Sequence, residues 1–388
     1  MKRAQLAVLP ALLVAGLTAV PASATAASPS SPSGSGTVHV VAPGQSIQAA
    51  VDAADPGDTI RLQAGTYRES VLVTEDDITV RGAGSGPGGT VLLPPAEFPD
   101  NACGNNPPLP EPPPYGAGIC IFGDWDGGAG PGTHTTRFTH GGRVTGIRFD
   151  GFAINIATVA TDGVRVDHNV SLHGGHYGIT HVLSKNGVVE DNTVVDAAHA
   201  GIYIGAYSVP DSGSIIRRNH VERSALAIST YDSQGVTLTR NTITDSCVGY
   251  LAFSDDLKLP GGDKLTVTRN EVVANNEQPT THGCHPVPFI DFPETNGSGI
   301  VLAGTTGSTI SRNTVTGNVG DLPLSGGLVV VSGQEFRGSP ATDEGSLTIS
   351  RNDLSGNGPE DVRWDGIGQD VDFTRNDCGT SSPAGLCD

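Results

Sequence analysis

Two histidines, His176 and His199, stand 23 positions apart in this 388-residue chain, and Tyr203 and Arg223 follow them. A neutral imidazole can accept a proton near neutral pH, and an arginine can hold a carboxylate through two parallel hydrogen bonds. A tyrosine offers an aromatic face and a hydrogen-bonding hydroxyl. These four residues are therefore candidate catalytic groups for removing a proton beside a carboxylate. The competing interpretation is that they are ordinary solvated turn residues.

Five further polar residues in the same stretch are candidate substrate-binding positions, namely His173, Asp196, Tyr231, Asp232 and Asp245. The sequence requires no cofactor, but carboxylates such as these supply the oxygen ligands that Ca²⁺ prefers. Asp196 and Asp245 could instead form the carboxylate pair of a glycosidase.

A repeat positions these residues. Eight segments share an alternating apolar strand, an asparagine and a second short strand: VRVDHNV, GVVEDNTV, SIIRRNHV, VTLTRNTI, LTVTRNEV, STISRNTV, LTISRNDL and VDFTRNDC. Their asparagines are Asn169, Asn192, Asn219, Asn241, Asn270, Asn313, Asn352 and Asn376, and we align Gly146 with them. The apolar residues alternate rather than following a helical period. Asparagine tolerates the left-handed conformation of a sharp turn, and stacked asparagines can form a ladder. The repeat therefore predicts an all-β parallel β-helix of about ten coils.

Residues at equal offsets from the asparagine should lie above one another. His173, Asp196, Arg223 and Asp245 stand four positions after it, and His176 and His199 stand seven positions after it on adjacent coils. The next strand is predicted to point Ile179, Ile202, Ile228 and Tyr250 inward, and Thr180, Tyr203, Ser229 and Leu251 outward.

A second column directly precedes the asparagine and contains Arg218, Arg240, Arg269, Arg312, Arg351 and Arg375. Such a line of guanidinium groups could bind a polyanion. The alternative is that each arginine caps turn carbonyls and stacks on the next coil.

The repeats and the stretch VVAPGQSIQAAVDAADPGDTIRLQAGTYRESVLVTEDDITVRGAG resemble the right-handed parallel β-helix superfamily that includes pectin lyases, in its exported bacterial form. The resemblance implies a single-stranded solenoid with an N-terminal capping helix near Ser46 to Ala54. In carbohydrate-active members it also implies a substrate groove along the strand after the two histidines, where a lyase or C5-epimerase removes the proton beside a uronate carboxylate. The DPHD-type epimerase motif is missing from this chain.

The first residues read as an export signal. Lys2 and Arg3 precede an apolar run over 6–20 and a small-residue cleavage site, so we expect a signal peptide over 1–26. Residues 27–36 are then a flexible linker, and 37–388 form the β-helix domain with a long Pro/Gly-rich insertion at 94–141. We expect a secreted protein.

All six cysteines follow this signal, and an even number in an exported chain favours disulfides. Fifteen connectivities are open to six cysteines. The sequential set closes the shortest loops: Cys103–Cys120, Cys247–Cys284 and Cys378–Cys387.

The formal net charge of −19 argues against a nucleic-acid partner, and no later apolar run is long enough to span a membrane. We expect a monomer whose partner is a polysaccharide or cell-wall glycan. Three classes stay open: a secreted polysaccharide-active or glycan-binding protein, a non-catalytic structural or adhesive rod, and a NosD-like copper-delivery protein. The last is disfavoured because copper-binding Met-rich or Cys-rich motifs are missing.

Overall fold

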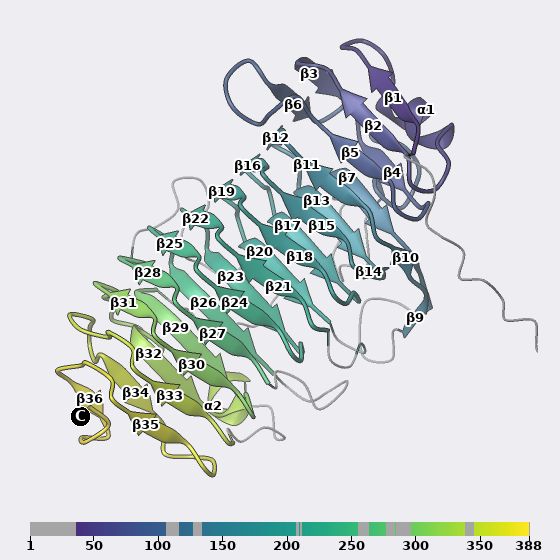
Figure 1. Ribbon diagram of the computed structural model, residues 1–388. Helices are drawn as coiled ribbons and strands as arrows, with labels where there is room; N and C mark the ends of the chain where they lie inside the picture. The colour runs from purple at the N-terminus through teal and green to yellow at the C-terminus, as the bar shows by residue number, and fades with distance from the viewer. Residues whose placement is uncertain are drawn as a thin grey trace, which may run out of the picture. The chain divides into compact units, whose positions relative to one another are not determined.

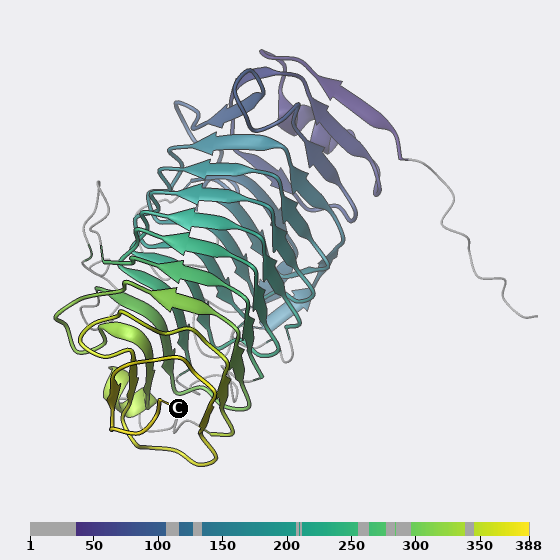
Figure 2. The same cartoon turned by 60° about the vertical axis from the view of Figure 1, so that its left-hand side comes forward.

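The computed structural model describes residues 36–105, 116–126, 134–206, 209, 212–254, 264–276, 284, 296–337 and 345–387. The predicted signal peptide (1–26) and all but the last residue of the predicted linker (27–36) lie outside these ranges. Within them, successive coils follow one another in chain order, each adding a strand to long parallel sheets (Figures 1 and 2). The predicted all-β parallel β-helix is confirmed.

Three sheets, here named A, B and C, run along the stack. Sheet A contains β1 (Val38–Val41), β2 (Thr59–Leu62), β5 (Thr79–Arg81), β11 (Arg143–Thr145), β15 (Arg165–Asp167), β18 (Val188–Glu190), β21 (Ile215–Arg217), β24 (Thr237–Thr239), β27 (Thr266–Thr268), β30 (Thr309–Ser311), β33 (Thr348–Ser350) and β35 (Asp372–Thr374). Sheet B contains β3 (Gly65–Arg68), β6 (Thr90–Leu93), β12 (Ile147–Asp150), β16 (Val170–Leu172), β19 (Thr193–Val195), β22 (His220–Glu222), β25 (Thr242–Thr244), β28 (Glu271–Val273) and β31 (Thr314–Thr316).

Sheet C has the longest strands and eleven of them, close to the predicted number of coils. It contains β4 (Val71–Val73), β7 (Ala117–Phe122), β13 (Ile154–Val159), β17 (Tyr177–Val182), β20 (Ala200–Gly205), β23 (Leu226–Tyr231), β26 (Val248–Phe253), β29 (Ser298–Ala303), β32 (Gly326–Val331), β34 (Val362–Trp364) and β36 (Ser381–Ser382). Outside the three sheets, β8 (Asp124–Asp126) pairs with β9 (His134–Arg137), and β10 (Thr139–His140) pairs with β14 (Thr161–Asp162).

The core is a stack of apolar side chains that face the inside of every coil. In sheet C the predicted inward residues are confirmed, because Ile179, Ile202, Ile228 and Tyr250 are fully buried in the main core. Their strands pair in register, so that each side chain rests on its counterpart in the next coil. Each coil is thus held mainly by its two neighbours.

The asparagine ladder is confirmed over all eight predicted residues. Between adjacent coils the side-chain oxygen of one asparagine accepts hydrogen bonds from the backbone and side-chain nitrogens of the preceding one, as Asn270 does from Asn241 at 3.0 and 2.9 Å. The same amide of Asn241 donates to the carbonyl of Ile216. These buried amides are therefore fully used by the turn between sheets A and B.

The predicted alignment of Gly146 with the asparagines is wrong by one residue. Ile147 holds the equivalent place, because its backbone nitrogen donates to Asn169 Oδ1. The left-handed conformation belongs to the residue before each asparagine, such as His168 (φ 55°) or Arg240 (φ 57°), and Gly146 (φ 70°) is its counterpart. The turn therefore uses two residues, of which the first bends the chain and the second bonds to the next coil.

A second ladder, which the sequence analysis missed, lies in the turn between sheets B and C. Asn275 bonds to Asn318 and Asn318 to Asn357 through backbone and side-chain nitrogens. Toward the N-terminus serines take the same place, with Ser224 donating to Ser246 and Ser246 to Asn275 through their backbone nitrogens. The mixture of serine and asparagine hid the column from a search for one residue type.

The predicted capping helix is confirmed as α1 (Ile47–Asp52), which covers the first coils with buried Ile47 and Val51. Ser46 is the N-cap and accepts a hydrogen bond from the backbone nitrogen of Ala49. Glu69, from the GTYRE segment, accepts bonds from Ser46 Oγ and from the first two backbone nitrogens of the helix. A carboxylate here satisfies free donors and complements the helix dipole. The second helix of the described chain, α2 (Gly333–Arg337), was not predicted.

The three predicted disulfides, Cys103–Cys120, Cys247–Cys284 and Cys378–Cys387, are all present and use all six cysteines. The expectation of one long loop at 94–141 is wrong, because four strands lie inside those bounds: the short β8, β9 and β10, and β7, which pairs with β4 and β13 of sheet C. Cys120 is one of its residues, so the first disulfide ties the preceding loop to the stack. Neither described helix is long and apolar enough to cross a membrane.

Candidate functional site

The two candidate histidines lie directly before neighbouring strands of sheet C. His176 precedes β17 and His199 precedes β20, and the backbone nitrogen of His199 donates to the carbonyl of His176 at 2.9 Å. Their rings are stacked, with centroids 5.1 Å apart and planes 11° from parallel. The predicted adjacency of the two imidazoles is therefore observed.

Two tyrosines complete an aromatic cluster, defined here as His176, Tyr177, His199 and Tyr203. Tyr177 stacks on Tyr203 at 5.0 Å and meets the rings of His176 and His199 edge-on at 4.1 and 5.3 Å. The cluster thus combines two of the residue types that can move a proton with two aromatic faces on which a sugar ring could pack.

Tyr177 was missed by the sequence analysis. Strict alternation from the inward Ile179 would place Tyr177 inside the coil. However, Gly178 between them faces the core, since an added Cβ would lie 2.5 Å from the Val194 side chain. Tyr177 consequently points outward and packs with Tyr203 in the cluster outside sheet C. A glycine recurs at this place in Gly201, Gly249, Gly299 and Gly327, and this recurrence was the available signal.

The expectation that His176 and His199 are exposed turn residues is wrong. Each residue is only 2% exposed, and Tyr203 is 7% exposed. Burial lowers the pKa of His176 to about 4. Burial, with the neighbouring His176, holds the pKa of His199 well below its usual value. Both imidazoles are therefore neutral at neutral pH.

Arg223, the fourth candidate catalytic residue, lies in the turn before β23. Its backbone is left-handed (φ 52°), and its guanidinium pairs with Glu222 at 2.6 Å. The side chain is 41% exposed. Arg223 is thus paired with Glu222, the last residue of β22.

The candidate substrate-binding residues fall into two places. His173, Asp196 and Asp245 share the left-handed turn column that also contains Arg223. In this column His173 pairs with Asp150 at 2.7 Å and approaches Asp196 at 3.9 Å.

Tyr231 and Asp232 lie instead at and just beyond the far end of β23. Tyr231 stacks on Phe253 with centroids 5.1 Å apart, and Asp232 accepts a hydrogen bond from Ser254. Across the described ranges, no three His, Cys, Asp or Glu side chains are grouped as a metal site would require, so no Ca²⁺ ligand set can be named.

The outer face of sheet C is otherwise mostly apolar, with Thr180 and Ser229 as the register partners of Tyr203. Its residues, among them Leu251, Val301 and Val329, pack into a second hydrophobic cluster with the aromatic cluster's tyrosines. Residues from outside the strands, including Cys103 and Phe336 of α2, belong to the same packing. The two neutral histidines are therefore titratable groups set in an apolar environment.

Comparisons with known proteins agree with this architecture. Residues 152–339 match the family model described as right handed beta helix region. The mannuronan C-5 epimerase AlgE4 A-module of Azotobacter vinelandii is similar in structure with a TM-score of 0.55 at 14% identity, over 85% of this chain and 90% of that chain. The periplasmic alginate epimerase AlgG has a TM-score of 0.50 at 14% identity, over 83% of this chain and 72% of that chain. No curated protein sequence matches the chain.

At this level of identity the likeness concerns the fold. The chain is a right-handed parallel β-helix protein with a pectin lyase-like fold. Its three disulfides indicate folding in an oxidising compartment.

Proposed function

We propose that this protein is exported and acts on an acidic, uronate-containing polysaccharide, as a lyase or C5-epimerase. The observation that carries the proposal is the aromatic cluster on the outer face of sheet C. Titratable groups with strongly shifted pKa values in an apolar site are candidates for catalysis. The solved structures with a similar fold include two named as epimerases of mannuronan and alginate, which supports a uronate polymer as the substrate class.

Both reactions begin by removing the proton on the carbon beside the uronate carboxylate. The imidazole of His176 or His199 can accept that proton, because the lowered pKa of each ring keeps it unprotonated at neutral pH. In a lyase the hydroxyl of Tyr177 or Tyr203 can donate a proton to the leaving oxygen. In an epimerase it can donate a proton to the same carbon from the opposite face of the sugar ring. Arg223 is our candidate for neutralising the substrate carboxylate, which would have to replace Glu222 as its partner.

A panel of uronate polysaccharides, each with and without Ca²⁺, tests the proposal. Ultraviolet absorbance of unsaturated sugars detects a lyase, and NMR of the recovered polymer detects an epimerase. Either product supports the proposal. Lack of both products on every polymer, at high protein concentration, rules out this reaction class.

A non-catalytic extracellular rod is the second candidate, and the burial of the cluster favours it. Only 2% of each histidine is exposed, so in this conformation the imidazoles pack more like core residues than like groups open to a polymer. The two side-chain ladders also stabilise a long, regular stack. Retention on immobilised polysaccharide without turnover would favour a binding protein, and lack of both would favour the rod.

A further inference from the structure

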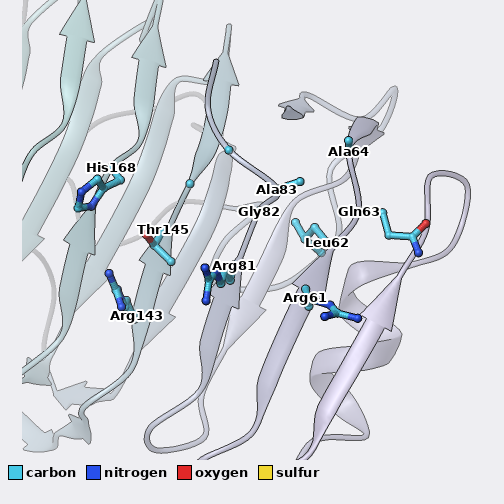
Figure 3. Close-up of a pocket in the computed structure, with 12 residues that line it drawn as sticks. Arg61, Leu62, Gln63, Ala64, Arg81, Gly82, Ala83, Arg143, Thr145 and His168 are labelled. Atoms are coloured by element: carbon cyan, nitrogen blue, oxygen red, sulfur yellow. The ribbon is translucent and has the colours of Figure 1, made fainter. Parts of the chain in front are cut away.

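A cavity of about 790 Å³ opens on sheet A, in the first coils and away from the aromatic cluster's sheet. Its walls carry Arg61 of β2, Arg81 of β5 and Arg143 of β11, with His168 of the next coil (Figure 3). No acidic residue lines it. Arg143 and His168 are both bonded to the carboxylate of Asp167. The positive charge that this cavity adds on a chain of net charge −19 is therefore that of Arg61 and Arg81.

Arg61 and Arg81 are direct register partners on neighbouring strands, which lie ~4.8 Å apart. Both are exposed, and neither forms an ion pair with any residue in the described ranges. Like charges directly opposite each other in a sheet destabilise it. Two adjacent arginines without a carboxylate are therefore an arrangement that a bound anion would stabilise.

The arginines further along the same sheet contrast with this pair. Arg143 forms two hydrogen bonds, at 2.6 and 2.5 Å, to the buried carboxylate of Asp167. Arg217 and Arg218 bond to the buried Glu190 at 2.5 and 2.6 Å. In these coils the chain supplies its own counterions, and in the coils of Arg61 and Arg81 it does not.

Small residues line the cavity at its turn. Gly82 and Gly146 occupy the turn position that later coils fill with His168, Asp191 or Arg218. An added Cβ on Gly82 would lie 2.2 Å from the carbonyl oxygen of Gly146, so this turn cannot carry a side chain without shifting. The space left beside Arg61 and Arg81 is within the usual range for ligand sites and larger than one small anion needs.

We infer that this cavity, defined by Arg61, Arg81, Arg143 and His168, binds an acidic oligosaccharide, with carboxylates of neighbouring sugar units on Arg61 and Arg81. Each guanidinium can hold a carboxylate through two hydrogen bonds. Arg143 and His168 line the site but are paired with Asp167, so Arg61 and Arg81 are the groups that would hold the anion. The choice of an acidic glycan rests on the proposed function, whereas the anion site rests on the arginines alone. This site would anchor a polymer on a different sheet from the one that carries the aromatic cluster.

Isothermal titration calorimetry of the full chain with short uronate oligosaccharides tests the inference. Neutral oligosaccharides of equal length and inorganic phosphate serve as comparison ligands. We expect Arg61→Gln and Arg81→Gln each to raise the Kd for the uronate by about tenfold, as for one lost charged hydrogen-bonding partner. Arg351→Gln is the matched control, because Arg351 is exposed, follows β33 of the same sheet near the opposite end and has no ion pair with a described residue.

Three results would overturn the inference: no uronate binding, equal binding by the Arg61→Gln and Arg81→Gln variants, or equal weakening by Arg351→Gln, which would indicate diffuse attraction. Tight phosphate binding without uronate binding would show an anion site for another ligand and overturn the glycan assignment. Turnover by a His199→Phe variant is measured in parallel. Lost turnover with intact binding concerns the aromatic cluster, and lost binding in the Arg61→Gln variant concerns the cavity, so the two proposals can fail separately.

Discussion

The Nδ1 atom of His181 lies 2.7 Å from Oγ1 of Thr158 inside the β-helix. Thr158 is the register partner of His181 in the preceding coil. His181 is fully enclosed by the stack, and burial lowers its pKa to about 4. At the same place in the next coil stands Ile204, which shows that the position accepts an apolar side chain. This histidine links acidity directly to the stability of the core.

We predict that His181 makes the protein less stable as the pH falls from about 6.5 to about 4. In this window the unfolded chain binds a proton at His181 that the native chain does not, so the free energy of unfolding decreases with falling pH. Above this pH window His181 is neutral in the native and the unfolded chain, so it does not make the free energy of unfolding depend on pH. The loss amounts to about 3 kcal/mol for a shift of this size.

Chemical denaturation at pH 7 and pH 4 of the parent and of His181→Ile measures this effect. The variant should lose about 3 kcal/mol less between the two pH values. His176 and His199 titrate in both proteins, so they cancel in the comparison. Parallel pH profiles would contradict the assignment of His181 as a buried neutral imidazole.

Asn241→Ala should lower the free energy of unfolding by about 1–3 kcal/mol, because it leaves buried backbone groups of Ile216 and Asn219 without partners. The neighbouring Arg240→Ala is the control. Arg240 is exposed, so its substitution should change stability by no more than about 0.5 kcal/mol. Equal urea midpoints for the Asn241 variant and the parent would show that the ladder contributes nothing measurable.

Replacing both Cys247 and Cys284 by serine should destabilise the protein by about 3–4 kcal/mol, as the loop-entropy relation gives for a separation of 37 residues. Peptide mapping without reductant should first recover the two cysteines in one linked fragment. A free thiol at either position would reject the pairing.

Much of the fold was predictable because a β-helix repeats its requirements coil by coil. The ladder from Asn169 to Asn376 and the inward isoleucines of sheet C recur at constant offsets, so eight copies reinforce one weak signal. The left-handed conformation was assigned to the asparagine, although it belongs to the residue before it. Gly146 did not reveal this, because a glycine fits either place in the turn.

The site was only half predictable. The stacking of His176 on His199 follows from their equal offset, and the structure confirms it. Their burial does not follow, because it depends on side chains outside their own column. One of these is Tyr177, whose ring meets both imidazoles edge-on. The orientation of Tyr177 depended in the same way on the inward Gly178, which breaks the strict alternation.

His199→Phe should preserve the cluster's packing and remove one proton acceptor. A phenyl ring can still stack on His176 and meet Tyr177 edge-on, so we expect the melting temperature to change by only a few degrees. Polysaccharide turnover should fall by at least about a hundredfold, the usual contribution of general acid–base catalysis. His220→Phe, on sheet B with a 43% exposed side chain, is the matched control. Unchanged turnover by the His199 variant would make the histidines structural.

Hydrogen exchange at the carbon beside the uronate carboxylate decides whether this protein acts on uronates, since a lyase and an epimerase both remove that proton. The wild-type protein is incubated with uronate polymers in heavy water, and the recovered sugars are analysed by NMR and mass spectrometry. We expect deuterium at this carbon in epimerised residues, or unsaturated chain ends in its place, and loss of both with His199→Phe. Recovery of every polymer unlabelled and uncleaved would contradict the proposed reaction and leave a non-catalytic β-helix with a binding or structural role.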